Sequence, residues 1–175
     1  EIDLQNGIIG LDTNIISIEN VVGGSGNDII RGSFESNLLQ AMGAADLIYG
    51  GGGQDTIVGA NYNDTLIGGE DNDHISGMVG YDSIISGGGN DTVFGGWYAD
   101  TIQGGEGNDL IYGDSATPVV GTDYDHGDRI FGGLGNDTIY GNGWHDIIFG
   151  DEGSDIIYGG TGNDSMDGGS DDDSI

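Results

Sequence analysis

The sequence contains no cysteine, one proline and two basic residues among its 175 residues. Without cysteine, neither a disulfide framework nor a cysteine-based zinc site can form. Phosphate binding needs Lys and Arg, and the chain has only Arg31 and Arg129. We therefore expect neither nucleic acid nor an anionic membrane surface as a partner. No apolar run approaches the length of a transmembrane helix, so we also expect no membrane insertion.

The sequence has few of the patterns that accompany catalysis. Its three histidines, His74, His126 and His145, show no H-E-x-x-H spacing, and no G-x-S-x-G nucleophile elbow occurs. The carboxylates lie in repeated turns, and rows of solvated acids lack the contrasting environments that separate a catalytic acid from a base. We therefore expect no active site in this chain.

Glycine and acidic residues dominate the composition instead. There are 39 glycines and 31 Asp and Glu residues, and the formal net charge is −29. Such a charge opposes compaction through self-repulsion, and the composition alone is typical of a disordered acidic chain. Divalent cations are the natural partner of a chain with this charge.

One nine-residue unit recurs along the chain. Its clearest form is Gly132-Gly133-Leu134-Gly135-Asn136-Asp137-Thr138-Ile139-Tyr140, which reads G-G-x-G-x-D-x-U-x, where U is a large aliphatic residue. We number these positions 1 to 9. The glycines permit backbone angles that a Cβ forbids, and the aspartate places a carboxylate beside turn carbonyls, which is the hard oxygen ligation that Ca²⁺ prefers.

The period of nine holds over sixteen copies. Asn37 fills one gap in the position 6 series, which otherwise contains Asp28, Asp46, Asp55, Asp64, Asp73, Asp82, Asp91, Asp100, Asp109, Asp128, Asp137, Asp146, Asp155, Asp164 and Asp173. Position 8 is never polar and contains Ile30, Leu39, Ile48, Ile57, Leu66, Ile75, Ile84, Val93, Ile102, Ile111, Ile130, Ile139, Ile148, Ile157, Met166 and Ile175. A disordered chain has no reason to keep this register, so disorder is expected only without calcium.

The unit predicts an all-β solenoid. Nine residues provide a six-residue turn and a three-residue strand, and two units make one coil with a strand on each side. Strands stacked about 4.8 Å apart would give about eight coils and a rod of roughly 40 Å. We expect residues 1–22 to form irregular coils that lead into the solenoid, and residues 23–175 to form its body. The spacing from Asp109 to Asp128 is ten residues too long, which predicts a loop at about 114–126.

These repeats resemble the RTX (repeats-in-toxin, haemolysin-type) calcium-binding nonapeptides over residues 23–175. The clearest copies are Gly23–Arg31, Gly50–Val58, Gly104–Tyr112, Gly132–Tyr140 and Gly159–Asp167. The resemblance implies a right-handed parallel β-roll, a two-sheet solenoid with several Ca²⁺ ions held between turns of successive coils. It also implies an extracellular, secreted or cell-surface protein exported by type I secretion, which is unfolded at low cytosolic calcium.

Turns alternate between two edges of such a roll, and the motif is better kept on one of them. The first edge carries the turns that begin at Gly50, Gly68, Ser86, Gly104, Gly132, Gly150 and Gly168. On the second edge, bulky residues replace turn glycines in residues 41–46, 59–64, 77–82 and 95–100, and the turns at Asp146 and Asp164 partly recover the motif. We therefore expect well-formed Ca²⁺ sites along the first edge and poorer, fewer or absent sites along the middle of the second.

The predicted metal ligands follow from this division. The carboxylate ligands are Asp28, Asp55, Asp73, Asp91, Asp109, Asp128, Asp137, Asp146, Asp155, Asp164 and Asp173. Carbonyl ligands are expected from Gly51, Gly53, Gly69, Gly87, Gly89, Gly105, Gly107, Gly133, Gly135, Gly153, Gly160, Gly162 and Gly169. Asp46, Asp64, Asp82 and Asp100 are doubtful ligands. Asp123 and Asp125, with Asp128, form either a further loop site or an ordinary polar loop.

Aromatic residues at position 9 should project outward on successive coils. One face offers Phe94, Tyr112, Tyr140 and Tyr158, and the other offers Tyr49, Phe131 and Phe149. Together with the bulky residues of the second edge they would expose much apolar surface. This surface either contacts a partner, such as a sugar polymer or another copy of the chain, or forms ladders that stabilise neighbouring coils.

The sequence is thus interpreted as a calcium-binding segment of a larger protein, acting as a calcium-triggered folding module and rigid spacer. Two alternatives remain open. The chain could be an adhesive or self-assembling module that binds through its aromatic residues. It could also be an accessory module of a secreted enzyme whose catalytic domain lies outside this chain.

Overall fold

The structure is a two-sheeted β-solenoid built from eighteen short strands. The computed structural model describes residues 2–3, 8–9, 19–114 and 127–175. The strands are β1 (Ile2–Asp3), β2 (Ile8–Ile9), β3 (Asn20–Val22), β4 (Ile29–Arg31), β5 (Leu38–Met42), β6 (Leu47–Gly51), β7 (Thr56–Asn61), β8 (Thr65–Gly69), β9 (His74–Val79), β10 (Ser83–Gly88), β11 (Thr92–Trp97), β12 (Thr101–Glu106), β13 (Leu110–Asp114), β14 (Arg129–Leu134), β15 (Thr138–Gly143), β16 (Ile147–Glu152), β17 (Ile156–Thr161) and β18 (Ser165–Asp167).

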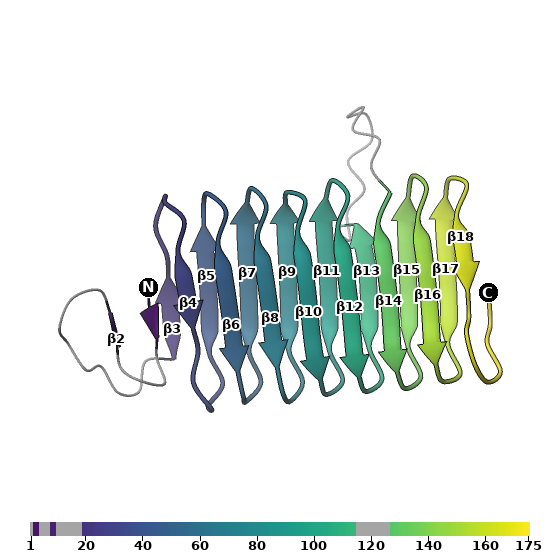
Figure 1. Cartoon of the computed structure of the whole chain (residues 1–175), viewed down its shortest axis with the longest axis horizontal. Helices are drawn as coiled ribbons and strands as arrows, with labels where there is room; N and C mark the ends of the chain where they lie inside the picture. Colours follow the sequence, from purple (N-terminus) through teal and green to yellow (C-terminus); the bar gives the residue numbers. More distant parts are fainter. Residues whose placement is uncertain (1, 4–7, 10–18, 115–126) are drawn as a thin grey trace.

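Successive strands alternate between the two sheets (Figure 1). One sheet has the order β18-β16-β14-β12-β10-β8-β6-β4-β1-β2, and the other has the order β17-β15-β13-β11-β9-β7-β5-β3. All pairs are parallel except β1 with β2. The predicted two-sheet parallel roll is therefore confirmed. In Figure 1 the second edge, where the even-numbered strands begin, is the upper one.

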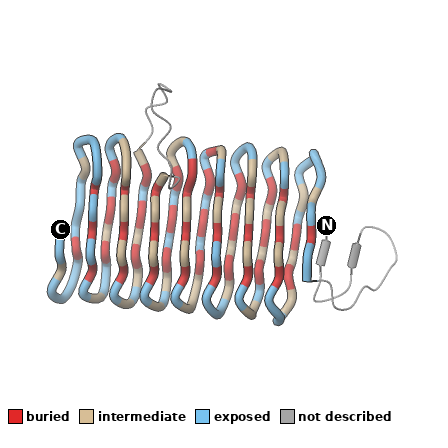
Figure 2. Tube along the Cα trace, turned by 180° about the vertical axis from the view of Figure 1, so that it is seen from behind, coloured by how far each residue is buried: buried red, intermediate tan, exposed pale blue. Residues whose placement is uncertain are grey.

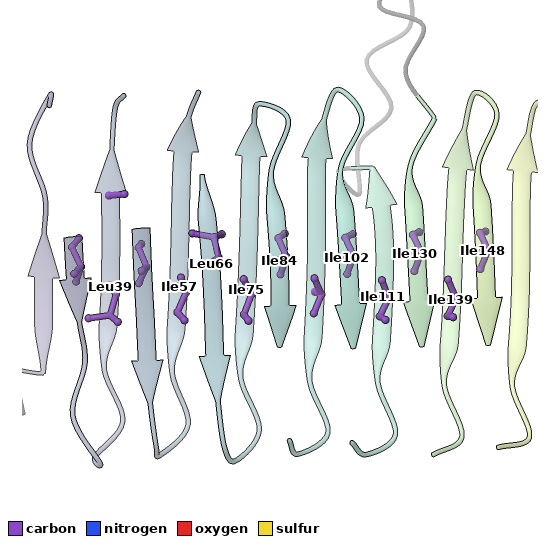
Figure 3. Close-up of a cluster of buried hydrophobic side chains, with 14 of the residues drawn as sticks. Leu39, Ile57, Leu66, Ile75, Ile84, Ile102, Ile111, Ile130, Ile139 and Ile148 are labelled. Carbon is purple, nitrogen blue, oxygen red and sulfur yellow. The ribbon is translucent and has the colours of Figure 1, made fainter. Parts of the chain in front are cut away.

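The register between neighbouring strands equals two repeats. Ile84 pairs with Ile102 and Val93 with Ile111, so each position 8 side chain lies against the equivalent one in the next coil. These residues fill the space between the sheets, as the labelled side chains in Figure 3 show. Each position 8 residue from Ile30 to Ile148 is at most 1% exposed. The buried positions recur at the same height on successive strands, which gives one continuous core along the rod (Figure 2).

The strands are longer than the sequence predicts. Most have five or six residues instead of three, because positions 1 and 2 continue the ladder before the turn begins. Gly50 illustrates the reason for a small residue at position 1. It is buried and faces inward, and a side chain there would collide with Asp55 Oδ2 and with the carbonyl oxygen of Gly68. Glycine therefore serves close packing as well as the turn.

The coil that contains residues 115–126 keeps the register of the roll. The Asp100 N–H donates to Asp128 Oδ1 across 28 residues, where the other coils use 18. Asp114, predicted to lie in the loop, is instead the last residue of β13. Its Oδ2 accepts a hydrogen bond from the Gly143 N–H at 2.9 Å, taking the place that a position 2 carbonyl oxygen has in regular coils. The Asp114 carboxylate thus caps the ladder where the extra residues begin.

Rings on the outer faces stack along the rod axis. The centroids of Phe94 and Tyr112 lie 5.0 Å apart with an interplanar angle of 2°, and those of Tyr112 and Tyr140 lie 4.9 Å apart at 7°. Phe131 and Phe149 stack on the opposite sheet. The faces of these rings are covered by one another, so this arrangement favours the stabilising ladder over a binding surface.

Two parts of the sequence interpretation concern segments that lie partly or wholly outside the described residues. Of residues 1–22, β3 lies in the eight-stranded sheet and β1 pairs with β4, while residues 1, 4–7 and 10–18 are outside the described part. Asp123 and Asp125 also lie outside it, so their loop site stays a prediction. Within the described residues, no helix is long and apolar enough to cross a membrane.

Candidate metal centres

The position 6 aspartates form one hydrogen-bonded ladder along each edge. From Asp46 onward, each carboxylate accepts a hydrogen bond through Oδ1 from the backbone N–H of the equivalent residue one coil earlier, whereas Asp28 accepts the Gly24 N–H through Oδ2. On the first edge Asp73 N donates to Asp91 Oδ1 and Asp91 N to Asp109 Oδ1, at 2.7 and 2.8 Å. On the second edge Asp46 N donates to Asp64 Oδ1 at 2.8 Å. These bonds hold each carboxylate in a fixed direction inside its turn.

The second oxygen of these carboxylates is buried and has no hydrogen-bond partner. This holds for Oδ2 of Asp46, Asp55, Asp64, Asp73, Asp82, Asp91, Asp100, Asp109, Asp128, Asp137, Asp146 and Asp155. A buried carboxylate oxygen without a partner is costly, because it loses its hydration and gains nothing in return. A row of such oxygens on both edges fits a ladder of cations better than a metal-free core.

Backbone carbonyls lie beside these free oxygens. A side chain at Gly132 would collide with both Asp137 Oδ2 and the carbonyl oxygen of Gly150, so the two oxygens face the same space. The second edge repeats this arrangement at Gly77, between Asp82 Oδ2 and the carbonyl oxygen of Gly95. Carboxylate and carbonyl oxygens are the donors that Ca²⁺ takes. The residues present therefore fit calcium on both edges.

The predicted carbonyl ligands sit at positions 2 and 4, where the backbone is left-handed. Gly105 has φ +115° and Gly107 has φ +132°, values that a Cβ makes unfavourable. A side chain at Gly107 would collide with the carbonyl oxygen of Gly89, and one at Gly105 with that of Gly87. The turn carbonyls of successive coils are thus packed directly over one another.

Residues other than glycine hold the same turns at different angles. In the described part of the chain, thirteen of the fourteen glycines with positive φ have values of +100° or more, whereas the eleven other residues lie between +75° and +92°. On the first edge these residues are all aspartates: Asp71, Asp151 and Asp171. On the second edge they are Met42, Ala44, Ala60, Tyr62, Met78, Tyr98, Asn142 and Trp144. Because φ sets the direction of the preceding carbonyl, the carbonyls before these eleven residues are turned relative to those before most of the glycines.

No metal site is built from side chains alone. Among the described residues, no group of three or more His, Asp or Glu side chains lies close enough to hold a metal ion. Each candidate site therefore depends on backbone oxygens for much of its ligand set. The turn conformation therefore matters for each candidate site, and residues other than glycine hold more of the left-handed positions on the second edge than on the first.

Burial raises the pKa of the turn aspartates on both edges. The pKa of Asp100 rises to about 9, mainly through burial and then through repulsion from Asp128, whose own pKa rises to about 8. On the first edge burial raises the pKa of Asp73 and Asp109 to about 7 and that of Asp137 to about 6. A bound cation would reverse these shifts, since it favours the ionised carboxylates.

The predicted carboxylate ligands come together as two straight rows. The last members, Asp164 and Asp173, still accept hydrogen bonds from the N–H groups of Asp146 and Asp155. The doubtful residues Asp46, Asp64, Asp82 and Asp100 occupy positions equivalent to those of the first edge, and each is at most 4% exposed. Whether their sites are poorer than those of the first edge stays a prediction.

One row of ordering residues was missed by sequence reasoning. On the first edge the position 5 asparagines form a ladder of their own, in which Asn90 N donates to Asn72 Oδ1, Asn108 N to Asn90 Oδ1, and Asn136 N to Asn108 Oδ1, at 2.7 to 2.8 Å. The signal was the recurrence of Asn before the repeat aspartate. On the second edge His145 takes this role, with Nδ1 accepting from Asn163 N.

Comparison with known proteins agrees with this geometry. The family model for the RTX calcium-binding nonapeptide repeat matches residues 22–57, 58–93, 94–116, 124–143 and 145–175. No curated protein matches the chain. The matched repeats bind Ca²⁺, and regularly spaced buried aspartates occupy the places where that function requires ligands. The chain belongs to the family of RTX calcium-binding nonapeptide repeat proteins.

Proposed function

We propose that this chain is a calcium-triggered folding module and rigid spacer of a larger secreted protein. The observation that carries the proposal is the set of twelve buried Asp Oδ2 atoms without a hydrogen-bond partner, in a chain with a net charge of −29. Without cations this fold would keep like charges in rows inside its turns. Folding and calcium binding should therefore be one event.

In the folded roll the residues of the chain have distinct tasks. Asp Oδ1 accepts the N–H of the preceding coil and so fixes the carboxylate, while Oδ2 and the turn carbonyls remain for the cation. Calcium, when bound, supplies the positive charge that offsets the paired carboxylates. The position 8 residues, such as Ile102 and Ile111, exclude water from the space between the sheets.

An extracellular role is supported by the concentration scale of such sites. Extracellular calcium modules of carboxylate and carbonyl ligands bind in a range of about 10⁻⁴–10⁻³ M. A chain with this affinity would stay unfolded where calcium is scarce and fold after export, as type I secretion requires of the family. The continuous parallel ladder supports the spacer role, because each coil stacks on the next in one register.

We also propose that the role is structural and not enzymatic. Among the described residues, the turn carboxylates repeat one hydrogen-bonded position in the backbone, which supports a shared structural role. Any enzymatic activity of the parent protein would then belong to another part of it.

The test is a calcium titration of the whole chain, followed by far-UV circular dichroism and size-exclusion chromatography. In EDTA we expect an expanded chain without β-sheet signal. We expect a cooperative change to a compact β-rich form over about 0.1–10 mM calcium. Magnesium and sodium chloride at equal ionic strength are the controls for charge screening. At pH 8, a β-sheet signal that persists in EDTA, or that either control restores equally well, would contradict the proposal.

A further inference from the structure

The second edge carries a groove between the turns of three successive coils. At position 4 the three successive coils of residues 59–100 present Tyr62, Gly80 and Tyr98. Coils stack about 4.8 Å apart, so the two tyrosines are separated by about 10 Å with a glycine between them. A side chain at Gly80 would collide with the carbonyl oxygen of Tyr62, which keeps the floor of this gap free of bulk.

The groove has the size of a small-ligand site. Its volume is about 550 Å³, and its walls come from three coils: Asn61, Tyr62 and Asn63 in the first, Val79, Gly80 and Tyr81 in the second, and Tyr98 in the third. Ligand pockets typically enclose about 300–1,000 Å³. The groove is open to solvent along the edge, so it can accept part of a longer chain.

Two of its tyrosines present substantial surface to solvent. Tyr62 is 67% exposed and Tyr81 is 46% exposed. Tyr81 packs against Tyr98 with ring centroids 5.3 Å apart and an interplanar angle of 42°, which leaves the rings splayed instead of stacked. The position 9 ladder differs, because Tyr112 and Tyr140 cover each other's faces at 7°. Exposed ring surface in the groove is therefore provided by Tyr62 and Tyr81, whereas Tyr112 lies between two stacked neighbours on the ladder.

The polar groups of the groove are held in place by the turns. Asn63 Oδ1 accepts the N–H of Tyr81 at 3.1 Å, which leaves the Asn63 NH₂ group outside that bond. Asn61 donates through Nδ2 to the carbonyl oxygen of Met42 at 3.4 Å, which leaves its Oδ1 outside that bond. A donor and an acceptor thus flank the tyrosine rings, as in sites that orient a polar ligand.

The lining contains no charged side chain, although the chain as a whole carries a net charge of −29. The negative surroundings disfavour an anionic ligand, and the carboxylate oxygen beside Gly80, Asp82 Oδ1, already accepts the Asp64 N–H. A neutral ligand with an apolar face and many hydroxyl groups matches the rings and amides together.

From this lining we propose that the groove binds a neutral saccharide. The C–H face of a sugar ring would pack on Tyr62 or Tyr81, and its hydroxyl groups would bond with Asn61 and Asn63. Both Tyr62 and Tyr98 are held at positive φ, +75° and +80°, where the repeat normally has glycine. The roll therefore accommodates these two rings at a cost in backbone strain.

The chain offers variants that remove the rings without damaging the fold. Tyr62→Gly and Tyr98→Gly restore the residue that the repeat prefers at position 4, so they relieve backbone strain as they remove a wall. Trp144→Gly is the matched control, because Trp144 has φ +75° at the same position of a turn outside the groove and is 40% exposed.

The experiment measures binding of the calcium-loaded chain to immobilised neutral oligosaccharides of hexoses and N-acetylhexosamines. Uronate and sulfated oligosaccharides, and tetramethylammonium in solution, are the comparison ligands. We expect the neutral series to contain a binder, with at least tenfold weaker binding by Tyr62→Gly and Tyr98→Gly and unchanged binding by Trp144→Gly.

Several results would overturn the inference. These are the absence of any neutral binder, equal binding by Tyr62→Gly, equal loss in Trp144→Gly, or a preference for the charged oligosaccharides or the quaternary ammonium ion. Circular dichroism is recorded on each sample in calcium. A folded, calcium-responsive chain that binds no saccharide would overturn the proposed saccharide site. The proposed calcium-triggered folding function would still stand.

Discussion

The two edges of the roll share one backbone path but place different residues at its left-handed positions. On the first edge, glycine or aspartate occupies the left-handed positions at 2 and 4. On the second edge, Met78, Tyr62, Tyr98 and Trp144 hold equivalent positions with φ values between +75° and +80°. The shared aliphatic core and the aspartate ladders impose the turn on both sides. The difference teaches that the fold accepts residues other than glycine at many of its left-handed positions, with φ values below those of most of the glycines.

The free-energy cost of the left-handed residues on the second edge can be estimated. A residue with a Cβ in the left-handed region is disfavoured by about 1–2 kcal/mol, less for Asn and Asp, whose short polar side chains bond locally. The first edge places only aspartates in that position, whereas the second edge places Met, Ala, Tyr and Trp there. The turns of the second edge are thus less stable than those of the first, and their carbonyls point in altered directions. The same turns present larger side chains to solvent.

The largest expected effect comes from pH, because it acts on all the turn carboxylates at once. Burial raises the pKa of Asp100 to about 9 and that of Asp137 to about 6 from an ordinary value of 3.8. The folded metal-free chain then binds more protons than the unfolded chain. Its stability is therefore highest below about pH 4 and falls as the pH rises through 6 to 9.

We expect the chain in EDTA to gain β-sheet signal when the pH is lowered from 8 to about 4–5. Asp100→Asn, on the second edge, should extend this metal-free fold to higher pH than Asp137→Asn on the first. Circular dichroism against pH in EDTA measures both effects. The predicted pH dependence is contradicted if acid produces no β structure. The predicted difference between the edges is contradicted if the two variants shift the transition equally.

The next effect separates the edges through single carboxylates in calcium. Asp109 on the first edge and Asp82 on the second are both 3% exposed, so they are a matched pair. With dissociation constants of about 10⁻⁴–10⁻³ M, one site contributes about 1.4–2.7 kcal/mol at 10 mM calcium. Asp109→Asn should lower the free energy of unfolding by this amount, and Asp82→Asn by less than half of it.

Urea unfolding in 10 mM calcium measures these losses, and calorimetric titration counts the ions bound by each variant. Equal losses would show that the turned carbonyls of the second edge bind calcium as well as those of the first. A larger loss of unfolding free energy in Asp82→Asn than in Asp109→Asn would show that the second edge holds the stronger calcium site.

A glycine exchange should have opposite signs on the two edges. Gly105→Ala forces a Cβ toward the carbonyl oxygen of Gly87 at φ +115°, and should destabilise the calcium-loaded fold by about 1–2 kcal/mol. Met78→Gly, at the same position of the second edge, relieves strain and should stabilise by about 0.5–1 kcal/mol after the entropy of glycine is subtracted. Thermal unfolding in calcium distinguishes the two, and destabilisation by both would contradict the strain argument.

The smallest effect concerns the position 5 ladders. Asn108→Ala removes an acceptor for Asn136 N at the exposed first edge and should lower the free energy of unfolding by about 0.5–1 kcal/mol. Asn63→Ala on the second edge removes a single bond of 3.1 Å and should have a smaller effect. Urea unfolding of both variants is the measurement, and a larger loss at Asn63 would contradict a first-edge ladder.

The core was predictable because its signal is redundant. Ile111 and Ile130 stand on either side of the long coil, and both reach the predicted place between the sheets. The strand length was not predictable, since the glycines of positions 1 and 2 carry turn chemistry but lie in the ladder. The capping role of Asp114 could not be predicted from the sequence either, because it depends on Gly143, which lies 29 residues away in the chain.

The sites were predictable in outline and not in detail. The spacing of the aspartates located both rows of carboxylates. It could not show that Oδ1 is engaged with the preceding coil while Oδ2 remains without a partner. Nor could it show that Tyr62 would keep the left-handed turn at φ +75° instead of breaking it. Those outcomes depend on packing between coils, which a single repeat does not contain.

The one long coil gives the rod a mechanical signature. Hydrogen bonds between coils run along the rod axis, so tension between the ends would peel coils from the terminus one at a time. A released coil of 18 residues can extend to about 60 Å, whereas the coil of 28 residues between Asp100 and Asp128 can extend to about 95 Å. A stretched molecule would therefore lengthen in equal steps except for one, and that larger step would mark how far the unwinding had travelled.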